Sequence, residues 1–278
     1  MAEITAEAVK KLRDRTGMQM MKCKAALQKA DGDMEKAIEI IRKENAGAID
    51  KVAGRETAEG RIGVFIDPAK QVGALIELRC ESAPVGKSDL FVQLANDLAK
   101  QVALHGAKSP DELFGQTFVD DAKKSINERI AEVVGLVSEN IKPARMARLT
   151  GLLGSYIHHD GSVGVMVRVE GEKADPQLLR DVCMHITARN PAAAVREQVS
   201  KETIDKELDI ARAQAAATGK PANIVEMIAE GKMKTWFAEN VLSEQPFVKD
   251  DSKTVGDLLK AAGLKLVEFV RLRVGEVG

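Results

Sequence analysis

The chain has 278 residues, of which 45% are hydrophobic and 30% charged, and its 41 basic side chains nearly balance its 42 acidic ones. This length is enough for two or three compact units. The balance of charge argues against a dominant nucleic-acid or membrane surface, which needs a basic excess. With one Trp and one Tyr, the chain also lacks the stacking platform of single-stranded nucleic-acid binders.

Residues 1–46 have the periodicity of three short helices. Thr5 can cap the first helix, which carries Leu12 on its apolar face and is broken by Gly17. Two more apolar stripes at helical spacing follow, so we predict a small three-helix bundle. Residues 47–60 contain three glycines among alanines and charged residues, a composition that is typical of a linker.

The next segment, residues 61–150, begins with an alternating pattern that helices do not have. Residues 62–66 alternate, a turn follows, and residues 74–80 form a second apolar run, which together predict a hairpin. Ser88 then caps a predicted helix, and a further helix is predicted near residues 120–137. We expect this segment to form the first half of an α+β core.

Residues 151–195 repeat the order of a hairpin followed by a helix. We predict two related halves that share one core, the second completed by residues 241–278, with chance similarity between two ordinary hairpins as the alternative. The two central runs also match in sequence, Val72-Gly73-Ala74-Leu75-Ile76 against Val163-Gly164-Val165-Met166-Val167.

Residues 196–240 show two helical stripes separated by Gly219-Lys220-Pro221, which predicts a helical hairpin. Both stripes are narrow and rich in alanine, so we expect the two helices to pack on each other and to project from the core. The hairpin is either a spacer or a docking arm. The expected fold class is therefore α+β, with an N-terminal three-helix module, a duplicated core with antiparallel sheets and a protruding helical-hairpin coiled coil.

The clearest enzyme-like signal is Gly86-Lys87-Ser88, which lies after a strand and before a helix, as a phosphate-binding loop does. That pattern also needs a glycine five positions before Gly86, where this chain has Glu81. Pro84 further removes one backbone donor. We favour a turn in which Ser88 caps the helix, with a nucleotide-binding enzyme as the alternative hypothesis.

No cofactor, metal or catalytic constellation is predicted. Three widely spaced cysteines form neither a disulfide framework nor a metal-binding pattern, and they indicate reduced thiols in a cytoplasmic protein. His158 and His159 are adjacent at a predicted hairpin tip and would face opposite sides, so they make a poor chelating pair. No apolar run is long enough to span a membrane, and an N-terminus with Glu3 and Glu7 lacks the apolar centre of a secretory leader.

Three methionines, Met18, Met20 and Met21, crowd the segment that follows Gly17. Core packing explains one or two of them, but all three exceed what so small a bundle can bury. Flexible, polarisable side chains of this kind are typical of docking surfaces. Core packing and partner binding both remain open for these residues.

Several motifs, in one order along nearly the whole chain, resemble those of the elongation factor Ts family. The motifs are Leu12-Arg13-Asp14-Arg15-Thr16-Gly17, Met20-Met21-Lys22-Cys23-Lys24-Ala25-Ala26-Leu27, Gly32-Asp33-Met34-Glu35-Lys36-Ala37-Ile38, Glu139-Asn140-Ile141, Gly154-Ser155-Tyr156-Ile157-His158, Gln245-Pro246-Phe247-Val248 and Lys253-Thr254-Val255. The resemblance implies a guanine-nucleotide exchange factor, which acts by binding the GTPase elongation factor Tu and not as an enzyme.

The resemblance also implies a layout. The three-helix module, similar to a ubiquitin-associated fold, would dock elongation factor Tu, with Leu12, Met20, Met21 and His158 as contact residues. The helical arm would mediate homodimerisation, a dimer of heterodimers or further contact, without direct nucleic-acid or membrane binding. Family members often carry a further C-terminal helical module, and because this chain stops at Gly278 we expect that contact to be absent or shortened.

One motif departs from the family pattern. The exchange loop of the family usually reads Thr-Asp-Phe-Val, and its aromatic ring wedges into the GTPase and disturbs the magnesium and phosphate site. This chain has Ser82-Ala83-Pro84-Val85, with no carboxylate at Ala83 and no ring at Pro84. Two hypotheses follow: the rigid loop still presses on the GTPase through its backbone and Val85, or the chain binds and stabilises the GTPase without exchanging its nucleotide.

Overall fold

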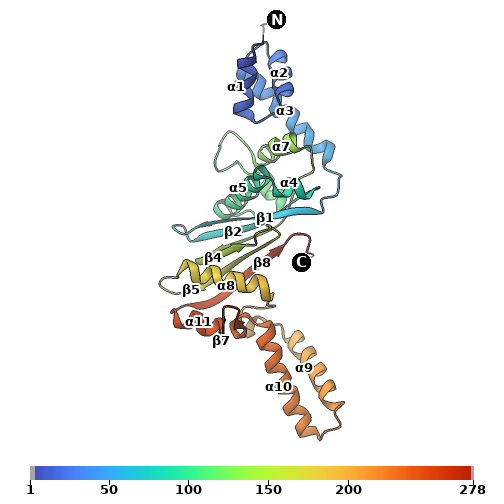
Figure 1. Ribbon diagram of the computed structural model, residues 1–278, viewed down its shortest axis with the longest axis vertical. Helices are drawn as coiled ribbons and strands as arrows, with labels where there is room; N and C mark the ends of the chain where they lie inside the picture. The colour runs from blue at the N-terminus through green and yellow to red at the C-terminus, as the bar shows by residue number, and fades with distance from the viewer. Residues whose placement is uncertain (1–3, 277–278) are drawn as a thin grey trace.

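The computed structural model describes residues 4–276, so Glu3 and Gly278 lie outside the described part of the chain. The molecule is elongated (Figure 1), with a helical module at one end, a layered body of sheets and helices in the middle, and a helical hairpin at the other end. The predicted α+β fold class is confirmed. Across residues 4–276, no helix combines the length and the apolar character that crossing a membrane requires.

The N-terminal module consists of α1 (Ala6–Thr16), α2 (Met20–Lys29) and α3 (Met34–Val52). Thr5 caps α1, because its hydroxyl accepts a hydrogen bond from the backbone N–H of Ala8 at 3.2 Å. Helix α3 continues to Val52, so the predicted linker is helical in its first part. The reason is packing, since Val52 and its neighbours lie against the core of the first half.

The first half of the body has the antiparallel sheet order β1-β2-β3, with β1 (Glu59–Asp67), β2 (Val72–Cys80) and β3 (Lys142–Thr150). Four helices accompany it: α4 (Ala83–Lys87), α5 (Asp89–His105), α6 (Pro110–Phe114) and α7 (Ile126–Val137). The core lies between this sheet and its helices.

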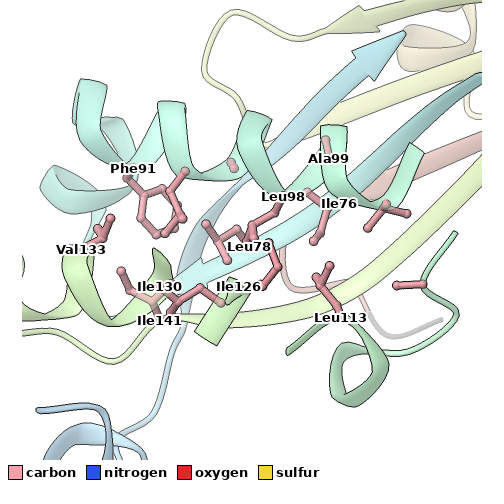
Figure 2. Packing of buried hydrophobic residues seen from close by; sticks show 14 of the residues in the cluster. Ile76, Leu78, Phe91, Leu98, Ala99, Leu113, Ile126, Ile130, Val133 and Ile141 are labelled. Carbon is pink, nitrogen blue, oxygen red and sulfur yellow. The ribbon is translucent and has the colours of Figure 1, made fainter. Parts of the chain in front are cut away.

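Figure 2 shows how that core is packed. Ile76 of β2 lies beside Leu98 of α5, and Leu78 of β2 lies toward Ile126 of α7; all four are fully buried. Burial of each such side chain stabilises the fold by about 1.5–3 kcal/mol. These residues fall on the apolar faces that the sequence predicts for the hairpin, for the helix after Ser88 and for the helix near residues 120–137.

The second half has the antiparallel order β4-β5-β8, with β4 (Leu152–Ile157), β5 (Val163–Glu170) and β8 (Lys265–Arg273). Helices α8 (Pro176–Arg189) and α11 (Val255–Ala261) cover its outer face. The remaining elements are two short 3₁₀ turns, Arg196–Gln198 and Leu242–Glu244, and a small hairpin of β6 (Pro246–Phe247) and β7 (Asp250–Thr254).

The two sheets lie face to face, with an apolar layer of Ile62, Leu75, Leu149, Met166 and Leu272 between them. Both glycines of the matched runs lie in this layer. A Cβ atom at Gly73 would approach Leu153 Cδ1 to 2.9 Å, and one at Gly164 would approach Ile62 Cγ2 to 2.4 Å. The matched sequences therefore have the same role in each half, because each allows close approach of the opposite sheet.

The helical arm consists of α9 (Lys201–Ala216) and α10 (Ala222–Asn240), and it projects from the body as a hairpin (Figure 1). Its narrow seam buries Ala211, Ala229 and Met233. Arg212 Nη2 lies 2.6 Å from Glu226 Oε1 across the two helices. The predicted helical hairpin is confirmed.

Candidate partner-binding site

Residues 82–85 match the exchange loop of the family resemblance and keep that name below. They follow the end of β2, and Ala83–Val85 belong to the short helix α4, where the sequence predicts a loop. The Ser82 carbonyl accepts a hydrogen bond from the Gly86 N–H at 3.1 Å. Pro84 is tolerated because the N–H groups of a first turn have no intrahelical partner. Its side chain is exposed, whereas Ala83 is half-buried and Val85 packs partly against the core.

Glu139 and Asn140, which we call the clamp, hold the start of this loop. The Glu139 carboxylate accepts hydrogen bonds from the backbone N–H of Ser82 at 3.1 Å and from its hydroxyl at 2.5 Å. The Asn140 N–H donates to Glu81 Oε1 at 2.6 Å, and its side-chain amide donates to the Arg55 carbonyl at 2.7 Å. The loop is therefore fixed to two segments that are distant in sequence.

Cys80 lies beside the loop, but it is not poised for thiolate chemistry. Burial, together with the negative charge of Glu139, raises the pKa of the Cys80 thiol to about 11. Its Sγ donates a hydrogen bond to the Ser82 carbonyl at 3.3 Å. A thiol that stays protonated at neutral pH is a packing residue and not a nucleophile.

The segment around Gly86 confirms the predicted helix cap. The Ser88 hydroxyl accepts a hydrogen bond from the Phe91 N–H at 3.3 Å and donates one to the Val85 carbonyl at 2.7 Å. The Glu81 carboxylate, which would repel a phosphate, is engaged by the clamp. This geometry favours a structural role for Ser88 over a role in binding a nucleotide.

The tip of the β4–β5 hairpin (residues 158–162), here called the His158 tip, lies at the same end of β1 as the loop. The Ile62 N–H donates to the Gly161 carbonyl at 2.9 Å, while Gly60 lies under Gly86 of α4. His158 is half-buried, with its Nδ1 3.4 Å from the Tyr156 hydroxyl. Among residues 4–276, no three His, Cys, Asp or Glu side chains gather as candidate metal ligands.

The three methionines separate into core and surface. Met18 is 2% exposed and belongs to the core of the module, whereas Met20 is 49% and Met21 74% exposed. We call the latter two the methionine patch. Leu12 differs from expectation, because its side chain is fully buried in the module core. It supports the module from within, and no part of it is available to touch a partner in this structure.

Helix α7 connects the methionine patch to the exchange loop. Lys22, which directly follows the patch, donates from Nζ to the Gly135 carbonyl of α7 at 2.9 Å. Leu136 of α7 packs against the core of the module. The clamp begins just after α7 ends. The C-terminal end of α7 therefore contacts the module that carries the methionine patch and leads directly into the residues that hold the loop.

The sequence patterns point to the loop, the methionine patch and the His158 tip as candidate contact residues, but no pattern points to the clamp or to Arg55. Glu81 was considered only as the residue that breaks a phosphate-binding pattern, and Glu139-Asn140-Ile141 only as a matched motif. Three polar residues, Ser138 to Asn140, between a predicted helix and the next apolar residue, Ile141, are the available signal. Their partners, however, lie 57 and 59 positions away in the sequence.

Comparisons with known proteins agree over almost the whole chain. Residues 81–276 match the model of a family described as Elongation factor TS. A relative named Elongation factor Ts from Thioalkalivibrio sulfidiphilus is 44% identical over 277 residues, covering 98% of this chain and 92% of the relative. Relatives of the same name from Halothermothrix orenii and Clostridium botulinum are 36% and 37% identical, each covering 98% of this chain and 93% of the relative.

Proposed function

The chain belongs to the elongation factor Ts family, and from this premise we propose that it binds elongation factor Tu in its GDP form and promotes release of GDP during translation elongation. Such a factor needs no catalytic side chain. It must bind the nucleotide-free GTPase more tightly than the GDP-bound GTPase, and it then weakens GDP binding by the same factor. Each tenfold loss of GDP affinity requires about 1.4 kcal/mol of differential binding.

We propose a separate role for each part of the chain, taken here in sequence order. Residues 1–46 dock on the GTPase through the methionine patch. Residues 61–150 present the exchange loop, while residues 151–195 and 241–278 hold the His158 tip beside it. The arm at residues 196–240 extends away from this end of the body and offers surface for further contact.

The observation that carries the proposal is the exposed Pro84 on a turn that is fixed from both sides. A rigid protrusion loses little conformational entropy on contact, so more of the interaction free energy remains for distorting the partner. Val85 is partly packed into its own core, which leaves Pro84 and the neighbouring backbone as the contact surface. Pressure from this surface on the magnesium and phosphate site would replace the aromatic wedge.

Stopped-flow release of a fluorescent GDP analogue from elongation factor Tu tests this proposal. We expect the wild-type chain to accelerate release and Pro84→Gly, which removes the rigid ring, to slow it. A double variant, Ala83→Asp with Pro84→Phe, restores the usual family residues and serves as the positive control. If the wild type gives no acceleration while this double variant does, the loop does not act as proposed.

A second function is favoured by the same loop. Ala83 and Pro84 supply neither carboxylate nor ring, so the chain could hold and stabilise elongation factor Tu without exchanging its nucleotide. Binding to the GTPase without acceleration of GDP release would establish this alternative. Isothermal titration of the chain alone with GTP and ATP addresses the nucleotide-binding hypothesis, and we expect no measurable affinity.

A further inference from the structure

We propose that Glu139 is a positioning residue for nucleotide exchange, which fixes the orientation in which the exchange loop presents Pro84 to the GTPase. The inference rests on the proposed function. It assigns a task to a residue that lies outside the loop and that no sequence pattern identified as part of the site.

Ser82 stands at the start of a helix, but its hydroxyl has a different role from that of comparable serines in the chain. The hydroxyls of Ser88, Ser109, Ser125 and Ser200 each accept a backbone hydrogen bond from the helix that follows. Within the described part of the chain, the Ser82 hydroxyl caps no helix and instead donates to Glu139. The helix start therefore gives up its usual cap for a link to a distant carboxylate.

The link is bidentate, which makes it a restraint on orientation. The Ser82 N–H bonds to Glu139 Oε2 and the Ser82 hydroxyl to Oε1 of the same carboxylate. Two hydrogen bonds from one residue to one planar group fix the backbone and the side chain of Ser82 together. Pro84 follows two residues later on the same turn, so its direction depends on this restraint.

Glu139 is itself held firmly. It follows Ser138, which ends α7 in a left-handed conformation with φ 60° and whose carbonyl accepts a hydrogen bond from Arg55 Nη1 at 3.2 Å. It precedes Asn140, which is 2% exposed and anchored to Glu81 and to the Arg55 carbonyl. The carboxylate is therefore part of a fixed frame.

The same frame carries the methionine patch, through the contact of Lys22 with the Gly135 carbonyl of α7. Glu139 thus sets the loop in a defined relation to the docking module. Without the restraint, the loop would sample several orientations, and only the fraction in the correct one would promote release. Docking through the module would not need the restraint.

Two single variants and their combination test the proposal. Glu139→Gln keeps the size of the side chain but offers one acceptor oxygen in place of two, and Ser82→Ala removes the hydroxyl. In stopped-flow GDP release, we expect either change to lower the maximal rate about tenfold and to leave the half-saturating chain concentration unchanged. The double variant should be no slower than the slower single variant, because both changes remove one interaction.

Glu128→Gln is the matched control. Glu128 accepts hydrogen bonds from the N–H of Ser125 at 2.7 Å and from its hydroxyl at 3.0 Å, at the opposite end of α7. The partners are again the N–H and hydroxyl of one serine, but both bond to the single oxygen Oε2 and the pair is remote from the loop, so we expect wild-type exchange. If Glu139→Gln reduces the thermal unfolding midpoint sharply, Ser82→Ala, a smaller change, carries the test.

The outcomes separate the two proposals. A wild-type chain that does not accelerate GDP release overturns both the exchange function and the role of Glu139. A wild-type chain that accelerates release, together with Glu139→Gln and Ser82→Ala at the same rate, overturns the positioning role alone. Equal slowing by Glu139→Gln and Glu128→Gln would also overturn it, since the effect would then be a general loss of stability.

Discussion

Each half of the body runs from a central strand through a loop into a covering helix. In the first half, the loop after β2 is fixed by the clamp and Arg55. In the second half, residues 171–174 follow β5, most of them exposed, and within residues 4–276 no side-chain hydrogen bond reaches them. The loop after β2 is therefore tied by side-chain hydrogen bonds that the loop after β5 does not have.

The difference marks the loop after β2 as the more strongly anchored of the two. The sheet, the close-packing glycines and the covering helix recur in both halves, so they serve the fold. The clamp occurs in the first half only, beside the loop that the family resemblance associates with exchange. Because the clamp is confined to one of two similar frameworks, we interpret it as serving the loop and not the shared framework.

The largest expected effect tests whether the two halves are equivalent as folds. Gly63→Ala and Gly154→Ala should each lower the free energy of unfolding by about 3 kcal/mol, as overpacked cores do. The new Cβ would lie 2.2 Å from the Ala95 carbonyl oxygen in the first case and 2.3 Å from Leu179 Cβ in the second. Urea denaturation measures both, and Gly231→Ala, with open space around it, should not destabilise the chain. Similar losses in the two halves would support the duplication.

The second effect concerns the contact between the two halves at Glu77 of β2, which binds the segment that follows β8. Glu77 is buried, and its carboxylate accepts hydrogen bonds from Arg145 Nε at 2.6 Å and from the Gly275 N–H at 2.9 Å. Glu77→Gln should lower the free energy of unfolding by about 2 kcal/mol, because it leaves a charged donor poorly paired. Glu268→Gln, which weakens the half-exposed pair with Arg168, should have a smaller effect of about 0.5 kcal/mol in the same urea titration. Equal losses of stability in Glu77→Gln and Glu268→Gln would contradict a special role for the Glu77 contact between the halves.

A third effect should arise only in the second half and depends on pH. Burial, with a smaller contribution from Arg189, lowers the pKa of His185 below its usual 6.5, although its bond to Gln245 opposes the shift. The unfolded chain therefore binds the proton more readily than the folded chain. Stability is complete above about pH 6.5 and declines as the pH falls toward the folded pKa, with a slope of at most about 1.4 kcal/mol per pH unit.

Urea titrations at pH 7.5 and 5.5 measure this pH dependence, and His185→Gln is the control, since it cannot take up the proton. The Nδ1 atom of His185 accepts the Val248 N–H at 3.2 Å, so protonation also removes a hydrogen bond. We expect the wild type to lose more stability than the variant on acidification. A parallel decline in both would show that other groups dominate.

The smallest effect is expected in the loop after β5, which no side-chain hydrogen bond reaches within residues 4–276. Lys173→Ala should change the free energy of unfolding by less than about 0.5 kcal/mol, as exposed substitutions usually do, and should leave GDP release unchanged. Lys173 is exposed, and within residues 4–276 no hydrogen bond or ion pair involves its side chain. A clear loss of exchange in this variant would mean that both loops act on the GTPase, which would remove the contrast between the halves.

Elements with strong local signals were predicted well from the sequence. Periodicity and caps located the three N-terminal helices, both central hairpins and the helical arm, because Thr5, Ser88 and the 219–221 turn act on nearby backbone. The predicted start of the linker, residue 47, lies too early in the sequence. Helix α3 continues to Val52 because its last residues pack against the body.

Strand β3 was missed for a different reason. Pro143 weakens any strand pattern, and the charged residues Lys142, Arg145 and Arg148 obscure its alternation. As an edge strand it tolerates proline, and Arg145 and Arg148 find partners in Glu77 and the Ala103 carbonyl. These partners come from other elements, so no local window of sequence contains the signal.

The most direct test of the account is the affinity of the purified chain for elongation factor Tu, measured by isothermal titration with and without GDP. We predict tight binding to the emptied GTPase that saturating GDP weakens, by the factor by which the chain weakens GDP binding. Equal affinity in the two states, or no binding to the emptied GTPase, would contradict the account.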